Sequence, residues 1–160
     1  MTETMPAEGE AAPSFQAQDQ QGNTVSLKEL AGRWVVLYFY PKDDTPGCTK
    51  EACNFRDNHG ALQGQGAVVL GVSGGTERSH AKFAEKYELP FPLLVDADNS
   101  IARAYGAWGK KKMFGKEYEG ITRSTFVIDP QGKVAKAWPK VKPDQHGEEV
   151  LNWLRTNASN

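Results

Sequence analysis

The sequence predicts an α/β fold in which a mixed central sheet carries helices on both faces. Two observations support this prediction: apolar runs of strand length alternate with segments of helical periodicity, and a hairpin signal follows near the end of the chain. A strand–helix–strand order makes neighbouring strands parallel, whereas a hairpin makes them antiparallel. The sheet should therefore contain both kinds of pair, with helices packed on each side.

Apolar runs predict the central strands. Residues 33–40 (RWVVLYFY) are almost all apolar or aromatic, which is typical of a strand buried on both faces, and Pro41 ends this run. Residues 67–72 (AVVLGV) form a second run, which is followed closely by two glycines. Residues 93–95 predict a third, short strand.

Turn residues predict two hairpins. The segments 124–128 and 133–138 flank Asp129-Pro130-Gln131-Gly132, in which proline restricts φ and glycine permits a positive φ. Short alternating segments within residues 15–27 surround Gly22-Asn23 and predict a small N-terminal β-hairpin. The lysine-rich stretch that includes Lys110-Lys111-Lys112, Lys116 and Phe114 is interpreted as a solvated loop.

Helical periodicity and capping residues predict four helices. A proline suits the first turn of a helix, and an aspartate suits the N-cap position. On these signals the helices begin at Pro46 and run through Phe55 and beyond, then cover residues 77–88 and 99–105, and finally extend from an N-cap at Asp144 through Arg155.

Composition limits the classes of function. The 160 residues suffice for one domain, which we place at residues 13–156 after a flexible N-terminus at residues 1–12. A net charge of −1 gives no overall field for binding nucleic acid or an anionic membrane. The chain has neither a long apolar span nor a signal peptide, so we expect a cytoplasmic protein. Two cysteines are too few for a disulfide scaffold and in that compartment favour thiol chemistry.

Cys48 is the first candidate for that chemistry. It follows the first core strand and falls in the first turn of the helix predicted from Pro46, at the carboxyl end of a strand, where open α/β sheets place their sites. The unpaired N–H groups and positive dipole of a helix N-terminus favour thiolate over thiol. An unperturbed cysteine is only about 3% thiolate at pH 7, so such a shift strongly activates the nucleophile.

Cys53 lies five residues further along the same predicted helix. That separation corresponds to about 8–9 Å between Cα atoms in a regular helix, whereas a disulfide tolerates at most about 7 Å. The two cysteines can therefore pair only if the first turns unwind, which predicts a redox switch. Two small apolar core residues are the simpler alternative, and a zinc site lacks a second cysteine pair, with His59, His80 and His146 scattered.

A resemblance adds to this interpretation. The pattern Pro41-x-x-x-Thr45-x-x-Cys48 resembles the active-site signature of the peroxiredoxins, and TPGCTKEACNFRD is similar to the PrxQ group, also called bacterioferritin comigratory protein. The similarity extends over roughly residues 13–154 and includes GITRSTFVID at residues 120–129. One departure is Ser73-Gly74-Gly75, where the group more often has Ser-x-Asp. The resemblance implies a thioredoxin fold.

The same resemblance implies roles for the two cysteines. Cys48 is the peroxidatic nucleophile, which hydrogen peroxide or an alkyl hydroperoxide oxidises to sulfenic acid. Cys53 is the resolving cysteine, which forms an intramolecular disulfide with Cys48. Thioredoxin or a similar dithiol protein then reduces this disulfide. The resemblance implies a monomer and no metal or organic cofactor.

Four further residues are implied to support Cys48. Thr45 offers a hydroxyl that can accept from the peroxide and donate to the sulfur, and we also expect it to cap the helix. Arg123 lowers the pKa of the Cys48 thiol and stabilises charge that develops on the peroxide oxygens. Pro41 packs over the site and limits water, and Glu51 orients Arg123.

Two other functions use the same cysteine pair. A thiol–disulfide oxidoreductase of the thioredoxin kind would have C-x-x-C and a proline before a later strand, where this chain has C-x₄-C and Thr122-Arg123. A peroxide sensor or holdase would use the same switch but turn over poorly. The glycines of Gly71-x-x-Gly74-Gly75 match no phosphate-binding motif and are interpreted as a structural turn.

Overall fold

The structure is a computed structural model that describes residues 5–113 and 115–158. The helices are α1 (Pro46–Asp57), α2 (His59–Gly64), α3 (Glu77–Lys86), α4 (Ser100–Ala104) and α5 (His146–Asn157), with a 3₁₀ turn η1 (Lys28–Leu30). The strands are β1 (Gln16–Gln18), β2 (Thr24–Ser26), β3 (Trp34–Phe39), β4 (Ala67–Ser73), β5 (Leu93–Val95), β6 (Trp108–Met113), β7 (Lys116–Ile121), β8 (Ser124–Ile128) and β9 (Val134–Trp138).

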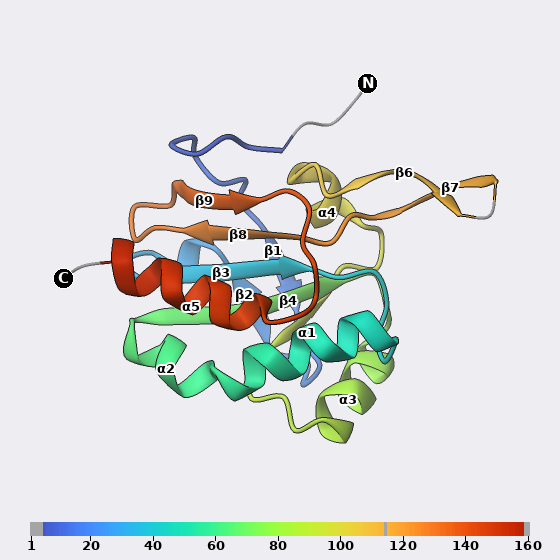
Figure 1. The fold of residues 1–160 in the computed structure, drawn as a ribbon, viewed down its shortest axis with the longest axis horizontal. Coiled ribbons are helices and arrows are strands. Elements are labelled where there is room, and N and C mark those ends of the chain that lie inside the picture. The colour runs from blue at the N-terminus through green and yellow to red at the C-terminus, as the bar shows by residue number, and fades with distance from the viewer. Residues whose placement is uncertain (1–4, 114, 159–160) are drawn as a thin grey trace.

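The central sheet is mixed, as predicted. Its five strands lie in the order β5-β4-β3-β8-β9 (Figure 1). β3 pairs in parallel with β4, and β4 pairs in parallel with β5, whereas β8 is antiparallel to both β3 and β9. The predicted N-terminal hairpin is confirmed as the separate two-stranded pair β1-β2.

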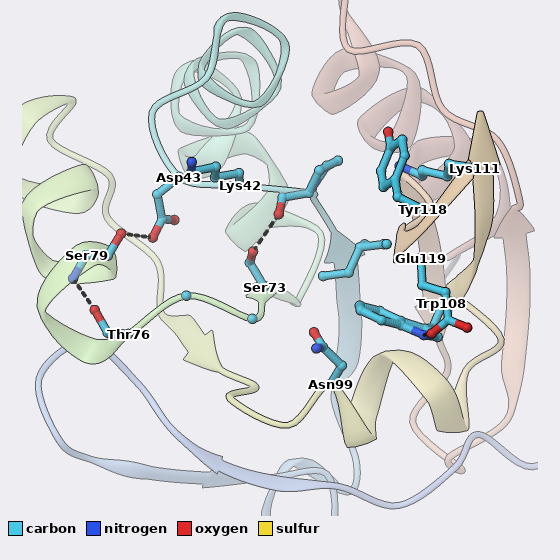
Figure 2. A pocket seen from close by; sticks show the side chains of 15 residues that line it. Lys42, Asp43, Ser73, Thr76, Ser79, Asn99, Trp108, Lys111, Tyr118 and Glu119 are labelled. Atoms are coloured by element: carbon cyan, nitrogen blue, oxygen red, sulfur yellow. Dashed lines mark hydrogen bonds between the residues drawn. The ribbon is translucent and has the colours of Figure 1, made fainter. Parts of the chain in front are cut away.

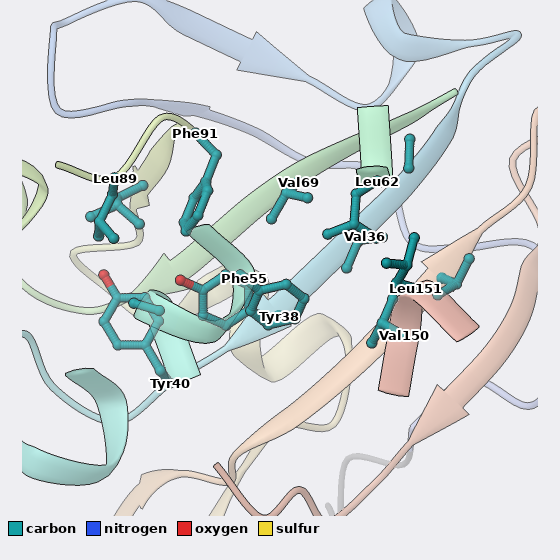
Figure 3. Close-up of a cluster of buried hydrophobic side chains, with 14 of the residues drawn as sticks. Val36, Tyr38, Tyr40, Phe55, Leu62, Val69, Leu89, Phe91, Val150 and Leu151 are labelled. Carbon is teal, nitrogen blue, oxygen red and sulfur yellow. The ribbon is translucent and has the colours of Figure 1, made fainter. Parts of the chain in front are cut away.

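β3 supplies side chains to a core on each face of the sheet, because successive residues of a strand point to opposite sides. Val36 and Tyr38, with Tyr40 just after the strand, enter one core, in which the Tyr38 ring stacks on Phe55 of α1 with centroids 4.6 Å apart (Figure 3). That core also contains residues of α2, α3 and α5. Val35, Leu37 and Phe39 enter the other core together with residues of α4. Helices thus cover both faces, as the alternating pattern predicted.

The start of α5 differs from the prediction. Its N-cap residue is Gln145, with φ 59°, and not Asp144, which instead forms an exposed ion pair with Lys50 at 3.3 Å. A side chain of α1 caps the helix, since the Glu148 N–H donates to Asn54 Oδ1 at 2.9 Å. The aspartate was a misleading signal because the cap comes from another element.

The lysine-rich stretch is also not the predicted loop. β6 and β7 form a hairpin that extends from the body of the protein (Figure 1). Lys110 is paired with Glu119 across the strands, and opposite charges in such positions stabilise a pair of strands. Phe114, part of that prediction, lies outside the described residues. High polarity concealed the strands because the hairpin contacts the core at its base, through Ile121 and Trp108, and its lysine-rich part lies beyond that base.

Part of the predicted flexible N-terminus contacts the central sheet. Residues 9–12, which we assigned to that segment, form hydrogen bonds beside the start of β9, and Ala11 forms a bridge with Lys133. Among the described residues, no helix is long and apolar enough to cross a membrane.

Candidate active site

Cys48 lies where the first central strand meets the first helix. β3 ends at Phe39, the β3–α1 loop (residues 40–45) follows, and α1 begins at Pro46. Cys48 is the third residue of α1, and the first intrahelical bond runs from the Thr49 N–H to the Thr45 carbonyl. The N–H of Cys48 therefore precedes the helical ladder and points from the helix N-terminus. The Cys48 side chain is buried.

Arg123 reaches Cys48 from another part of the chain. It precedes β8, and the β3–β8 register pairs Phe39 with Ser124, so the arginine emerges beside the end of β3. Its Nη2 donates to Cys48 Sγ at 3.3 Å. A Cβ on Gly47 would lie 3.0 Å from this Nη2, so glycine leaves room for the guanidinium. A cationic donor in this position favours the thiolate.

Glu51 holds the other side of the guanidinium. Arg123 Nη1 donates to Glu51 Oε1 at 2.8 Å, and the glutamate is fully buried one turn after Cys48. Burial raises the pKa of Glu51 to about 7, although Arg123 opposes the shift. Burial lowers the pKa of Arg123, but the charges of Glu51 and Cys48 outweigh it, so the pKa rises overall. Arg123 is therefore cationic beside the sulfur at any pH of interest.

Thr45 occupies the predicted N-cap position, but its side chain does not cap the helix. Its backbone is extended, while Oγ1 donates to the Lys42 carbonyl at 2.9 Å. This bond stabilises the turn of the loop instead of an N–H of α1. Because the hydroxyl proton is used there, Thr45 does not donate to the Cys48 sulfur as the resemblance implied, and its oxygen is left as an acceptor.

Pro41 lies at the rim of the site. It is exposed, and its carbonyl accepts a hydrogen bond from Ser73 Oγ at 3.4 Å. It lines a pocket of about 550 Å³ between the β3–α1 loop and the β6–β7 hairpin, with Trp108 and Tyr118 on the hairpin side (Figure 2). The water-limiting role of Pro41 stays a prediction.

Cys53 is separated from this arrangement. It is half-buried and lines a different pocket, of about 330 Å³, with Pro46, Thr49 and Tyr87. Both cysteines are free and α1 is continuous between them. The structure thus brings Cys48, Arg123 and Glu51 together and leaves Cys53 on another side of the helix.

Sequence reasoning missed two charged groups near the site. Asp43, inside the signature segment, has a nearly buried carboxylate that accepts hydrogen bonds from Tyr40, Ser79 and His80. Lys111 of β6 also lies near the site. Burial lowers its pKa, the charge of Arg123 lowers it further and Cys48 opposes the shift, so the pKa is lowered overall. The position of Asp43 within the signature was an available signal, but nothing in the sequence indicates that Lys111 approaches.

The glycines after β4 leave room for polar side chains of neighbouring segments. A Cβ on Gly74 would lie 2.5 Å from Asn99 Oδ1, and one on Gly75 would lie 3.0 Å from Asp43 Oδ2. Among the described residues, no group of three or more histidine, cysteine or acidic side chains is arranged to hold a metal ion.

A buried cysteine at a helix N-terminus, with an arginine donating to its sulfur, is an arrangement typical of thiol enzymes, and comparison with known proteins identifies the class. The model of the AhpC/TSA family matches residues 9–137. The chain belongs to the AhpC/TSA family.

Individual relatives narrow this to the bacterioferritin comigratory protein group. Peroxiredoxin Bcp of Bacillus subtilis is 50% identical over 147 residues, which cover 92% of this chain and 94% of the relative. Peroxiredoxin Bcp of Escherichia coli is 43% identical over 150 residues, covering 94% and 96%. Solved structures of Xanthomonas campestris bacterioferritin comigratory protein, which address its alkyl peroxide reduction activity, include one with a TM-score of 0.86, 40% identity and coverage of 91% and 92%. The resemblance and the thioredoxin fold that it implied are confirmed.

Proposed function

We propose that this thiol-dependent peroxidase reduces hydrogen peroxide and alkyl hydroperoxides with Cys48 as the attacking thiolate. The observation that carries the assignment is the 3.3 Å contact between Arg123 Nη2 and Cys48 Sγ at the N-terminus of α1. Similarity to the Xanthomonas campestris protein, with its alkyl peroxide reduction activity, supports the substrate class.

The first chemical step transfers one oxygen. The Cys48 thiolate attacks the terminal oxygen of the hydroperoxide, an S–O bond forms and the O–O bond breaks. The alkoxide or hydroxide that leaves takes up a proton, and Cys48 becomes a sulfenic acid. The Arg123 guanidinium stabilises the charge that develops on the oxygens, the Thr45 hydroxyl accepts from the peroxide O–H, and Glu51 keeps the guanidinium in place.

The second step requires a change of structure. Cys53 lies in the same continuous helix, and a regular helix separates residues at that spacing by about 8–9 Å between Cα atoms. The first turns of α1 therefore unwind before the Cys53 thiolate attacks the sulfenic sulfur. The S–O bond breaks, hydroxide leaves and is protonated to water, and the Cys48–Cys53 disulfide forms.

A dithiol protein completes the cycle. One of its thiolates attacks the Cys48–Cys53 disulfide, and its second thiol then resolves the mixed disulfide. We assign this step to thioredoxin or a similar reductant, and we place the enzyme in the cytoplasm as a monomer whose domain spans residues 13–156. The presence of only two cysteines, both free, is consistent with a reducing compartment.

The decisive experiment follows NADPH consumption with thioredoxin, thioredoxin reductase and peroxide. Cys48→Ser should abolish activity, because a serine hydroxyl is not ionised at neutral pH. Retention of more than a few per cent of the rate would remove Cys48 from the nucleophile role. A sensor would turn over poorly in the same assay, and a thiol–disulfide oxidoreductase would not consume peroxide directly.

A further inference from the structure

A second buried polar cluster joins the β3–α1 loop to the start of α3. The Asp43 cluster consists of Asp43, Tyr40, Ser79 and His80. The Asp43 side chain is 5% exposed, yet its carboxylate accepts from Tyr40 at 2.7 Å and Ser79 at 2.7 Å and contacts His80 Nδ1 at 2.6 Å (Figure 2 shows the Ser79 bond). One loop carboxylate thus joins the end of β3 to the first turns of α3.

The hydrogen-bond roles of the two His80 ring nitrogens follow from the groups that they contact. Its Nε2 lies 2.9 Å from the Leu94 carbonyl, which can only accept, so Nε2 donates. A carboxylate also only accepts, and the contact with Nδ1 therefore holds a proton as well. Burial raises the pKa of Asp43, but the hydrogen bond and charge of His80, together with the hydrogen bonds from Ser79 and Tyr40, outweigh it and lower that pKa overall. The pair is accordingly a charge-assisted bond, which is stronger than a neutral one.

The surroundings give this bond a fixed geometry. His80 is fully buried, and Thr76 caps α3 by accepting from the Ser79 N–H at 3.0 Å, which orients the turn that carries Ser79 and His80. Gly75 allows the carboxylate to approach, since a Cβ there would crowd both Asp43 Oδ2 and the His80 ring. The loop is therefore attached to α3 and β5 only five residues before Cys48.

We propose that the Asp43–His80 pair is a positioning element for peroxide reduction, which holds the β3–α1 loop so that the first turn of α1 presents Cys48 to Arg123. This inference rests on the proposed function. The pair touches neither the peroxide nor the sulfur, so it acts through the loop backbone. Misplacement of a reacting group by about 1 Å can cost a hundredfold in rate.

The same anchor limits where α1 unwinds. Asp43 fixes the chain before the helix, while Phe55 in the core and Asn54, bonded to the Glu148 N–H, fix it after Cys53. Residues 45–53 lie between these two attachments and contain both cysteines. Loss of the Asp43 anchor should therefore weaken the folded conformation that attacks peroxide, but not the unwound conformation that forms the disulfide.

The test compares two amides at position 80. The amide of His80→Asn replaces Nδ1 and keeps a donor to Asp43, whereas the amide of His80→Gln replaces Nε2 and keeps the donor to Leu94. In a Cys53→Ser background, which isolates the peroxide step, His80→Gln should lower the second-order rate constant about 10–100-fold. His80→Asn should stay within about threefold of the parent, even though it is smaller and leaves the larger packing defect.

The resolving step supplies a readout that general destabilisation would not change in this way. In the two-cysteine chain, His80→Gln should form the disulfide from sulfenic acid at least as fast as the wild type and should be less over-oxidised by excess peroxide. Equal loss in His80→Asn and His80→Gln, an unchanged peroxide step, or equal slowing of both steps would overturn the proposal.

Two further variants keep the test usable if His80→Gln does not fold. Ser79→Ala removes one half-buried donor to Asp43 and should slow the peroxide step about 3–10-fold, and an unchanged rate would contradict the proposal. Asp44→Asn is the matched control, because Asp44 is the neighbouring carboxylate but is exposed, bonded to Lys86 and Tyr87 at the surface. The second-order rate constant of Asp44→Asn with peroxide should equal that of the parent. Cys48→Ser, run in parallel, tests the proposed function itself, so the two failures are distinguishable.

Discussion

The two ends of α1 differ in what surrounds them. The first turn buries the small Cys48 side chain in the core and contacts Arg123 through its sulfur, whereas the later turns bury the whole Phe55 ring in the same core and pack on α5. Polar contacts of this kind are worth about 1–3 kcal/mol each, while a buried aromatic ring costs about 3–5 kcal/mol to remove. We therefore expect the first turn of α1 to unwind more readily than the turns around Phe55.

The largest effect is expected from removing the polar contact at the first turn of α1. Arg123→Ala removes the cationic donor from Cys48 Sγ and leaves Glu51 buried without its partner. Loss of one such donor costs about 10²–10³ in rate, so the second-order rate constant with peroxide should fall by that factor in stopped-flow measurements. An unchanged rate with the fold intact would show that the arginine is misassigned.

Cys53→Ser separates the two steps. One equivalent of peroxide should still be consumed rapidly, because the attack requires only Cys48, but thioredoxin-linked turnover should fall strongly. Excess peroxide should then drive Cys48 to sulfinic acid, detectable by mass spectrometry. Disulfide-dependent turnover that persists in this variant would mean that another group resolves the sulfenic acid.

Hydrogen exchange on the reduced and oxidised wild type measures how the two ends of α1 differ in stability. Oxidation should remove protection around residues 46–53 and leave most of the protection near Phe55, because only the first turns unwind. Equal protection in the two forms, together with a mapped Cys48–Cys53 disulfide, would contradict the unwinding mechanism.

The pKa of Glu51 gives a pH dependence. Its value of about 7 in the fold lies above the ordinary 4.5, so this group's contribution to stability is fully present below about pH 4.5 and is lost as the pH rises to about 7. Glu51→Gln should remove that slope from the pH dependence of the free energy of unfolding.

The same variant has a kinetic signature. Glu51→Gln should react with peroxide about 3–10-fold more slowly at pH 8, where the wild-type carboxylate orients Arg123 through a charge-assisted bond. The difference should shrink below pH 6, where Glu51 is itself protonated. A constant ratio of rates across this range would argue against an ionised Glu51 in the active enzyme.

The smallest effect on activity is expected from a change at the last turns of α1, where the helix packs on α5. A Cβ on Gly147 would lie 2.8 Å from the backbone of α1 at Asn54 and Phe55. Gly147→Ala should therefore lower the free energy of unfolding by about 1–3 kcal/mol, as overpacked cores do, with little change in the peroxide rate constant. A large loss of rate without loss of stability would show that this end is not merely structural.

The sequence by itself determined the elements whose signals are local. Apolar runs predicted β3 and β4, turn residues predicted the β8–β9 hairpin, and Pro46 with the preceding run placed Cys48 in a first helical turn. These signals are reliable because a strand buried on both faces must be apolar throughout and because proline restricts its own backbone. The spacing of the two cysteines likewise follows from helix geometry alone.

Only the tertiary structure decided which distant groups meet. The pairing of Phe39 with Ser124 brings Arg123 to Cys48, and without the family pattern nothing distinguished this arginine from Arg103. The helix α5 is capped by Asn54 of α1 and not by the predicted Asp144. Burial, which cannot be seen in the sequence, raises the pKa of Glu51. The Asp43–His80 bond was hidden for the same reason: strand register and helix packing, not local propensity, bring side chains far apart in the chain together.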